Sequence, residues 1–498
     1  MKGSLIGAAF MVVLSAHALA SGSMEESFPG GDRRLAALRL LHDGRFDEAE
    51  EVLESSSSTP ADPSIAFFRA FVIYWRLLYD EGNQPLQRTF EERLEAAIRA
   101  AENAQHERPK DPEPPLWAGS SHLLLAQLRA SQKKPFAAAV EARRTRRDLE
   151  VSRKAGGSGS EPLFGLGTYN YMADRVPAFV KGVRFLLFLP GGNREEGLDQ
   201  LGQAASESRY FALEARLLLT TIYANKHERL YEEAVRQSDL AGVLAPDAIA
   251  VLHASAVLSL SLGRLTEAVR FLDRALDRAA SAQRTDISVV ATLLYQRARS
   301  EFGLFRPDLT LERLRPMIAY QNALPRAVRG EAWQLACDAA ALSGTPNWFP
   351  ELALALHGST SPSPRSGASM TAAASAWQRA LPALEIERTG GIESSAKALL
   401  ELADSPPREP VVALLAGRAL LLAGRGEEAL RWLQKAESSF QLPSLWVGPC
   451  RLMAGRAADL AGSRPRAVQF YKKAQEGASF IGREAAYQGM VRPFRLAP

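Results

Sequence analysis

The amino-acid sequence predicts an all-α protein built from repeated helical hairpins. Three observations predict this class. The 498-residue chain is rich in Ala, Leu, Arg and Glu, which favour helices, and runs of β-branched residues are scarce. A decamer of the pattern G-R-x-x-E-A-x-x-x-L occurs three times, and small residues return at 34-residue intervals. Because the chain is longer than one core usually organises, we expect an elongated repeat array.

The first twenty residues have the pattern of a secretory signal peptide. Lys2 supplies a positive charge, residues 5–14 are apolar, and Ala18 and Ala20 form an A-x-A site. An uncleaved membrane anchor is the less favoured alternative, because a spanning helix needs about 20 apolar residues. We expect cleavage after Ala20 and an exported protein, either periplasmic in a Gram-negative cell or secreted.

The three decamers each predict the turn and second helix of a hairpin. They occupy residues 44–53, 263–272 and 424–433. Glycine at the first position accepts the positive φ at which the preceding helix ends. The alanine lets the second helix pack closely on the first, and the leucine four residues later extends the same buried stripe.

The spacing of small residues identifies the type of repeat. Ala234 and Ala268 are 34 residues apart, as are Ala241 and Ala275, and this period is typical of tetratricopeptide repeats. Near the C-terminus a set of Gly, Arg, Ala and Leu residues recurs after 38 residues, from residues 417–436 to residues 455–474. We interpret the longer offset as one repeat with extra loop residues. The spacing therefore predicts an α-solenoid of tetratricopeptide-type hairpins.

A Ser/Pro-rich segment predicts the division of the chain. Residues 358–371 are dominated by Ser, Pro, Gly, Thr and Ala, a composition typical of a linker. We therefore expect a signal peptide at 1–20, a degenerate N-terminal repeat array at 21–357, and a C-terminal array at 372–498.

Residues 163–202 depart from the repeat template and resemble a known family. Asn193 is placed to cap a helix, with Glu196 completing a capping box. The stretch resembles the centre of a eukaryotic tetratricopeptide-repeat family linked to lipid droplets, the outer mitochondrial membrane and inclusion-body clearance. The matching residues are Gly165, Gly167, Tyr169, Asn170, Pro177, Arg184, Phe188, Gly191, Asn193, Arg194, Gly197 and Leu198. The resemblance implies a helical repeat fold and an adaptor role, although the export signal departs from a cytosolic family.

An apolar segment at 183–189 leaves two interpretations open. Its side chains, with Phe185 and Phe188 among them, either fill the core between hairpins or contact a membrane surface or partner helix. A peripheral membrane protein that uses this segment is therefore an alternative function.

The sequence carries no recognisable catalytic, cofactor or metal motif. The histidines are scattered, and Cys337 and Cys450 each lack a nearby cysteine, so no metal-ligand spacing occurs. The strings Ser131-x-x-Lys134 and Ser394-x-x-Lys397 lack the partner motifs of penicillin-binding enzymes. The formal net charge of +4 argues little for nucleic acid. We expect a non-enzyme without cofactors, while an enzyme assembled from distant residues remains an alternative.

The predicted partner site lies on the concave face of the solenoid. The first helix of each hairpin lines that face, where repeat proteins capture peptides. The repeat register places six candidate residues there: Arg216, Tyr223, Lys226, His253, Arg418 and Arg456. A basic and aromatic lining suits an acidic ligand or a C-terminal carboxylate. The leading hypothesis is an exported adaptor that binds a protein or peptide partner.

Overall fold

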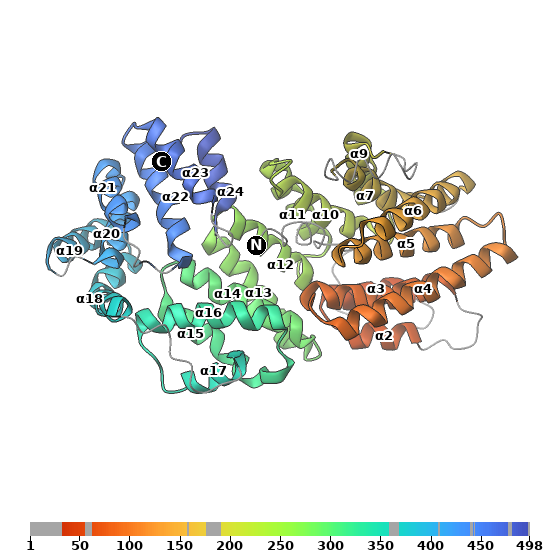
Figure 1. Cartoon of the computed structure of the whole chain (residues 1–498), viewed down its shortest axis with the longest axis horizontal. Coiled ribbons are helices and arrows are strands. Elements are labelled where there is room, and N and C mark those ends of the chain that lie inside the picture. Colours follow the sequence, from red (N-terminus) through yellow and green to blue (C-terminus); the bar gives the residue numbers. More distant parts are fainter. Residues whose placement is uncertain are drawn as a thin grey trace. The chain divides into compact units, whose positions relative to one another are not determined.

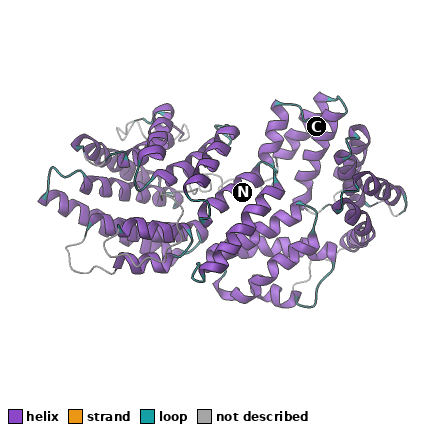
Figure 2. Cartoon of the chain, turned by 180° about the vertical axis from the view of Figure 1, so that it is seen from behind, coloured by secondary structure: helices purple, strands orange, loops and turns teal. Residues whose placement is uncertain are grey.

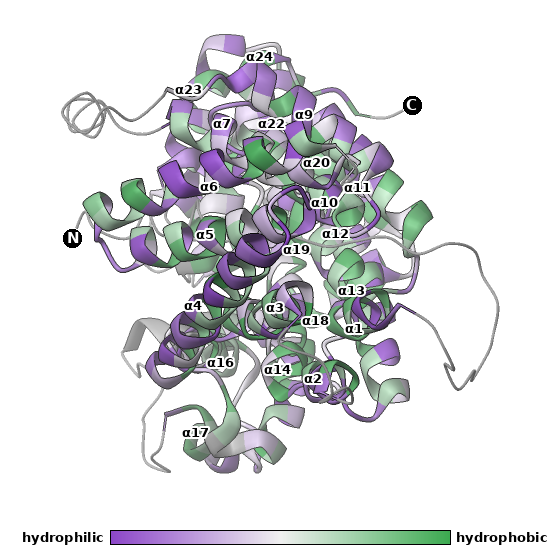
Figure 3. Cartoon of the chain, turned by 90° about the vertical axis from the view of Figure 1, so that its right-hand side faces the viewer, coloured by the Kyte–Doolittle hydropathy of each residue, from purple (hydrophilic) through white to green (hydrophobic). Residues whose placement is uncertain are grey.

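The computed structural model consists of helices, as the sequence predicts. It describes residues 32–54, 62–156, 159–175, 191–357, 368–406, 409–438, 442, 444–476 and 481–496. Every regular element in these ranges is a helix (Figures 1 and 2). Most helices carry both apolar and polar residues along their length (Figure 3), as amphipathic helices do. None of the described helices combines the length and the hydropathy needed to cross a membrane.

The chain divides into two compact units, which share three helices. Unit 1 comprises residues 1–255 and 274–290, and unit 2 comprises residues 256–273 and 291–498. The shared helices are α12 (Ile249–Ser261), α13 (Leu265–Ala282) and α14 (Ile287–Gly303).

The remaining helices follow one another as packed pairs. The pairs of unit 1 are α1 (Arg33–His42) with α2 (Phe46–Glu54), α3 (Pro63–Tyr79) with α4 (Gln84–Glu107), α5 (Glu113–Ser131) with α6 (Pro135–Ala155), α7 (Glu161–Arg175) with α9 (Arg194–Glu207), and α10 (Ala212–Ala224) with α11 (Tyr231–Leu244). Unit 2 contains α15 (Pro307–Leu314), the 3-10 helix η1 (Arg315–Ala323), α16 (Arg326–Ser343) with α17 (Phe349–His357), α18 (Ala368–Arg388) with α19 (Ile392–Asp404), α20 (Pro410–Leu422) with α21 (Gly426–Glu437), α22 (Ser444–Leu460) with α23 (Arg464–Gln475), and α24 (Arg483–Val491). The chain is therefore an α-solenoid of tetratricopeptide-type hairpins.

The division into units differs from the predicted pair of arrays at 21–357 and 372–498. The units separate within α12, α13 and α14, and not at the predicted linker, residues 358–371. Helices on either side of that segment pack together, because α18 contacts both α16 and α20. Helix α18 also begins at Ala368, inside the predicted linker. Packing of the flanking helices, and not composition, decides where a unit ends.

The three decamers form the turns that the sequence predicts. Gly44, Gly263 and Gly424 have φ values of 66°, 70° and 76°. The amide after each glycine donates to the carbonyl five residues earlier, at 2.8 to 2.9 Å, which is the six-to-one bond of a Schellman motif. The decamer alanines, Ala49, Ala268 and Ala429, are 0% exposed. Both the turn glycine and the packing alanine are therefore confirmed.

The arginine and glutamate of the decamer also have a structural role, which sequence reasoning did not assign. Arg45 pairs with Glu48 at 2.5 Å, and Arg425 pairs with Glu428 at 2.7 Å. Each pair joins the residue before the second helix to the first turn of that helix. The three-residue spacing in G-R-x-x-E was the available signal.

Close helix packing explains the glycines of the stretch that resembles the eukaryotic family. A Cβ on Gly167 would lie 2.8 Å from the carbonyl oxygen of Gly197, so α7 and α9 meet backbone to backbone. The Asn193 side chain caps α9 by accepting from the amides of Glu195 and Glu196 at 3.0 and 3.2 Å. The predicted capping box is incomplete, because the Glu196 carboxylate accepts from Gln200 instead.

In unit 1, the first hairpin contacts the turn between α13 and α14. The amide of Asp286 donates to the carbonyl of Gly44 at 2.8 Å. Arg278 pairs with Asp43 at 2.5 Å, although the two residues are 235 positions apart in sequence. The contacts at this seam of unit 1 are therefore largely ionic and polar.

In unit 2, the turn between α12 and α13 contacts the start of α24. The amide of Gly482 donates to the carbonyl of Leu260 at 3.0 Å. Ile481 packs with Leu260, Leu265 and Ala268 in a buried apolar cluster. This seam of unit 2 is therefore largely apolar.

Several sequence predictions concern residues outside the described ranges. These are the signal peptide at 1–20 and the apolar segment at 183–189. Cys337 and Cys450 are described, and they are not joined by a disulfide. Burial raises the pKa of Cys450 to about 12.

Candidate partner-binding surfaces

The six predicted partner-binding residues lie on or directly after the first helices of hairpins. Arg216 and Tyr223 belong to α10, and Lys226 follows that helix. His253 lies on α12 within unit 1. Arg418 and Arg456 lie on α20 and α22 of unit 2, one residue after glycines that pack against Leu433 and Tyr471. Four of the six belong to unit 1, and Arg418 and Arg456 belong to unit 2.

Arg216 is a half-buried cation without a carboxylate partner among the described residues. Its Nη1 donates to the side-chain oxygen of Gln237 at 3.2 Å, while its Nε has no hydrogen-bond partner there. Burial lowers the pKa of the Arg216 guanidinium, and the charge of Arg236 lowers it further. The charge of Arg216 is therefore poorly compensated within the described chain.

Tyr223 and Lys226 flank a well-fixed connection between α10 and α11. Tyr223 is half-buried, and burial raises the pKa of its hydroxyl. Lys226 is exposed. The neighbouring Glu228 forms ion pairs with Arg175 and Arg194 and accepts a hydrogen bond from a tyrosine of α7. These contacts hold the connection against α7 and α9.

His253 is stacked on an aromatic ring inside unit 1. Its ring centroid lies 5.7 Å from that of Tyr79, and its Nε2 atom has no hydrogen-bond partner among the described residues. Burial lowers the pKa of His253 to about 4, so the imidazole is neutral at neutral pH. This residue supplies an aromatic surface and no positive charge.

Arg418 is already engaged by an internal carboxylate. It pairs with Glu387 at 2.6 Å and lies over the ring of Phe305 at 5.3 Å. The ring of Phe305 packs in turn on Trp446 at the centre of unit 2. A ligand that used Arg418 would compete with Glu387.

Arg456 differs from Arg418, although the repeat places them at equivalent positions. It has no ion pair in the described part of the chain, and burial lowers the pKa of its guanidinium. Its guanidinium carbon lies 5.0 Å from the centroid of the Phe494 ring, which is a cation–π contact. Arg456 therefore contacts the segment that follows α24.

Sequence reasoning missed both Asp459 and Phe494 at this position. The amide of Phe494 donates to the Asp459 carboxylate at 2.8 Å. A usable signal existed, because the residue 38 positions before Asp459 is the apolar Leu421. An acidic residue at a position that is apolar in the neighbouring repeat departs from the repeat template.

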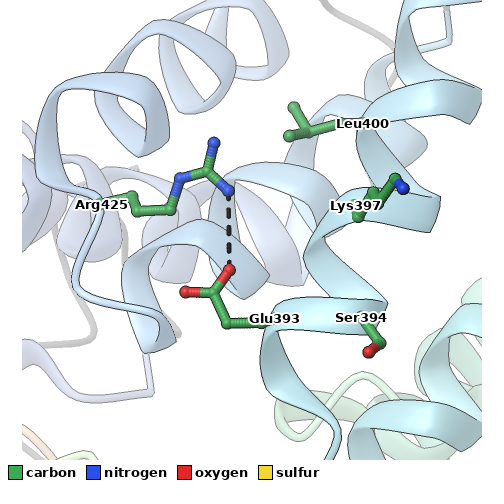
Figure 4. A pocket seen from close by; sticks show the side chains of 5 residues that line it. All are labelled: Glu393, Ser394, Lys397, Leu400 and Arg425. Atoms are coloured by element: carbon green, nitrogen blue, oxygen red, sulfur yellow. Dashed lines mark ion pairs between the residues drawn. The ribbon is translucent and has the colours of Figure 1, made fainter.

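A separate open pocket in unit 2 brings one of the Ser-x-x-Lys strings together with an arginine. Its lining comprises Glu393, Ser394, Lys397, Leu400 and Arg425 (Figure 4). Arg425 faces Glu393 and pairs with it at 3.6 Å, while Ser394 and Lys397 do not point toward each other. Without a hydrogen bond from Ser394 to a base, the pocket shows no activated nucleophile. Among the described residues, no group of three potential ligands for a metal ion is present.

Comparison with known proteins gives only distant structural neighbours. No protein-family model and no curated protein sequence matches the chain. The chain is similar to the crystal structure of the P58(IPK) TPR domain, with 12% identity, 92% of this chain and 95% of that chain covered, and a TM-score of 0.24. It is similar to the yeast Sti1 TPR2AB domain in complex with pHSP90, with 15% identity, coverage of 56% and 95%, and a TM-score of 0.21. For the human IFIT1 dimer with m7Gppp-AAAA, the identity is 13%, the coverage 91% and 85%, and the TM-score 0.26. The fold assignment rests on the hairpins and turns described above.

Proposed function

We propose that the chain is an exported, non-catalytic adaptor that binds an acidic protein or peptide partner through the first helices of its hairpins. The observation that carries this proposal is the burial of Arg216 and Arg456 without an ion-pair partner in the described part of the chain. Both guanidinium groups are partly desolvated, and neither has a carboxylate partner among the described residues. One such arginine lies in each unit.

A partly buried charge without a counter-ion is costly. Elsewhere in the chain, buried arginines are paired, as Arg297 is with Asp273 and Glu301. A half-buried guanidinium without a counter-ion loses hydration and gains no ion pair in return. A partner carboxylate would satisfy Arg216 through charge-assisted hydrogen bonds, which are stronger than those to the amide of Gln237.

Two parts of the proposal rest on the sequence. Export is supported by Lys2, the apolar residues 5–14 and the A-x-A site ending at Ala20. A relationship to the eukaryotic lipid-droplet family is supported by the residues shared within 163–202. The glycines of that match serve helix packing, so what would be common to both is the fold of this segment.

Affinity capture tests the proposal. The mature chain, residues 21–498, is immobilised and exposed to solubilised envelope proteins of its own cell, and retained proteins are quantified by mass spectrometry. We expect Arg216→Ala with Arg456→Ala to reduce retention of a specific partner at least about tenfold, because truncating one side of a hydrogen-bonded charge pair costs about 2–5 kcal/mol. Retention should also weaken with added salt.

A matched variant separates this effect from a general loss of charge. Arg274 on α13 is exposed and pairs with Asp247 at 3.0 Å, so Arg274→Ala should leave retention unchanged. Equal retention by the parent and the double variant would contradict the proposed role of the two arginines.

A further inference from the structure

The segment that follows α24 lies on the surface of unit 2 as an extended peptide. Arg492 has extended backbone angles, φ −125° and ψ 132°, and residues 493–496 form no helix. Two bonds fix the end of α24 before this segment, because Arg464 donates to the carbonyls of Gly489 and Met490, each at 2.7 Å. The extended segment therefore starts from a fixed point.

One buried carboxylate holds the main chain of the segment. The side chain of Asp459 on α22 is 1% exposed. It accepts the amide of Phe494 at 2.8 Å, the hydroxyl of Tyr471 at 2.8 Å and a guanidinium bond from Arg464 at 3.0 Å. Because the last two bonds orient the carboxylate, one oxygen is presented to a peptide amide.

Alternate side chains of the segment face the helices. Side chains two residues apart point to the same side of an extended chain. Phe494 lies under the guanidinium of Arg456, and a Leu496 methyl carbon lies 3.1 Å from where a Cβ on Gly424 would be. Arg495, between them, is exposed. The surface thus contacts an aromatic side chain and an aliphatic side chain that are two residues apart in the bound segment.

We propose that this surface of α22 and the α20–α21 turn is a peptide-binding site, and that residues 492–496 occupy it as a tethered pseudo-ligand. Its ligand is an extended peptide that places an aromatic side chain on Arg456, a main-chain amide on Asp459 and an aliphatic side chain at Gly424. The inference deepens the proposed function, since it names the peptide pattern that one of its two arginines recognises.

The contacts of the segment are suited to exchange with a partner. Phe494 is only half-buried, and Leu496 remains 41% exposed. A short tether gives an effective concentration in the millimolar range, so even this modest contact area suffices to keep the site occupied. A partner peptide with the same pattern must compete with the tether, which lowers its apparent affinity in proportion to the occupied fraction.

Fluorescence anisotropy tests this site with a peptide of the same sequence as residues 491–498, labelled at its N-terminus and amidated at its C-terminus. The full chain carrying Phe494→Ala and Leu496→Ala has an emptied site. We expect it to bind the peptide at least about tenfold more tightly than the parent does. The full chain with Arg495→Ala is the matched control and should behave as the parent, because Arg495 points to solvent.

Two further measurements keep the outcomes distinct. A labelled peptide with alanine in place of the phenylalanine should bind no variant. Thermal melting of the double variant shows whether unit 2 stays folded. If it does not, a chain truncated after Arg492 replaces the double variant as the protein with an emptied site. Failure of the peptide to bind either folded variant, or equal binding to the parent and the emptied site, overturns the inference. A free-acid form of the peptide tests the carboxylate preference of the proposed function separately.

Discussion

The two units differ in the contacts that a decamer turn makes: these contacts are ionic in unit 1 and apolar in unit 2. Unit 1 joins its first hairpin to the α13–α14 turn through ion pairs such as Arg278 with Asp43, whereas unit 2 packs Ile481 into an apolar cluster at its seam. For buried acids inside the units the contrast is reversed, because the ion-paired acid lies in unit 2. Glu214 of unit 1 is a buried acid without a hydrogen-bond partner among the described residues, whereas Glu301 of unit 2 pairs with Arg297 and Arg306.

This contrast shows that the same type of hairpin turn can be packed through ionic contacts or through apolar contacts. Both seams use a decamer turn: the carbonyl of Gly44 accepts a bond in unit 1, and Gly482 packs against Gly263 in unit 2. The turn supplies a fixed backbone in either case. The side chains around it decide whether the seam responds to salt or to the loss of apolar contact.

The largest expected effect concerns the paired acid of unit 2. Arg297→Met removes the main partner of Glu301, whose side chain is 2% exposed, and leaves a buried carboxylate with only the half-exposed Arg306. We expect a loss of about 3–5 kcal/mol in the free energy of unfolding, measured by urea denaturation. The exposed Arg236→Met is the control and should change it by less than about 1 kcal/mol. Equal losses would show that Glu301 is not sensitive to its partner.

The apolar seam of unit 2 gives the next largest effect. Ile481→Ala removes a 5% exposed side chain from its cluster and should cost about 2–5 kcal/mol. The loss should be the same at low and high salt, because no charge is involved. Val491→Ala at the last residue of α24, where the side chain is 60% exposed, is the control and should be close to neutral. A strong salt dependence of the Ile481 effect would contradict an apolar seam.

Glu214, the acid of unit 1 that is buried and unpaired within the described residues, should make the stability of the protein depend on pH. Burial raises the pKa of Glu214 well above its ordinary value of 4.5, and Glu161 raises it further. An acid with a raised folded-state pKa loses stability as pH rises through that pKa, so the parent should be more stable at about pH 5 than at about pH 8. Glu214→Leu should add about 1–3 kcal/mol at about pH 8, because it removes an unsatisfied polar group. Thermal melting across pH measures both.

Glu214→Gln separates charge from polarity in the same experiment. It should reduce the pH dependence, to which Glu161 with its raised pKa also contributes, while gaining less stability than Glu214→Leu, because its amide stays unsatisfied. If the parent and both variants lose stability equally between the two pH values, another group titrates.

The smallest effect should come from the ionic seam of unit 1. Arg278→Ala removes the pair with Asp43 and should cost at most about 1 kcal/mol, because the arginine is well exposed. Hydrogen exchange of the Asp286 amide, which bonds to Gly44, should be faster in this variant at low salt. At 1 M salt, where the screening length is about 3 Å, the exchange rates of this amide in the parent and the variant should converge. Arg264→Ala, which removes a helix-surface pair with Glu267, should leave that amide unaffected.

Much of the hairpin structure was predictable because it depends on single residues. Positive φ at Gly44, Gly263 and Gly424 follows from the residue type and its place before a helix. Burial of Ala234 and Ala268 follows from their 34-residue spacing. Composition predicted less well where packing decides, since the proposed linker at 358–371 lies between helices of the same unit.

The candidate site was predicted only in part. The repeat register placed Arg418 and Arg456 at equivalent positions, and the structure confirms that both follow a packing glycine. It could not show that Glu387 neutralises one of them while Phe494 covers the other. Glu387 belongs to the hairpin that precedes α20, and Phe494 lies outside the hairpins, so neither contact follows from equivalent positions in the repeat.

The sequence by itself determined the helical hairpins, their turns and the small residues that let neighbouring helices meet. These features are local, because a glycine's backbone freedom and an alanine's size act within one or two adjacent helices. Only the tertiary structure decided that Arg278 meets Asp43, that Gly482 meets Leu260, and that residues 492–496 lie on α22. Such contacts depend on small rotations summed over many repeats, and a repeat pattern does not specify that sum.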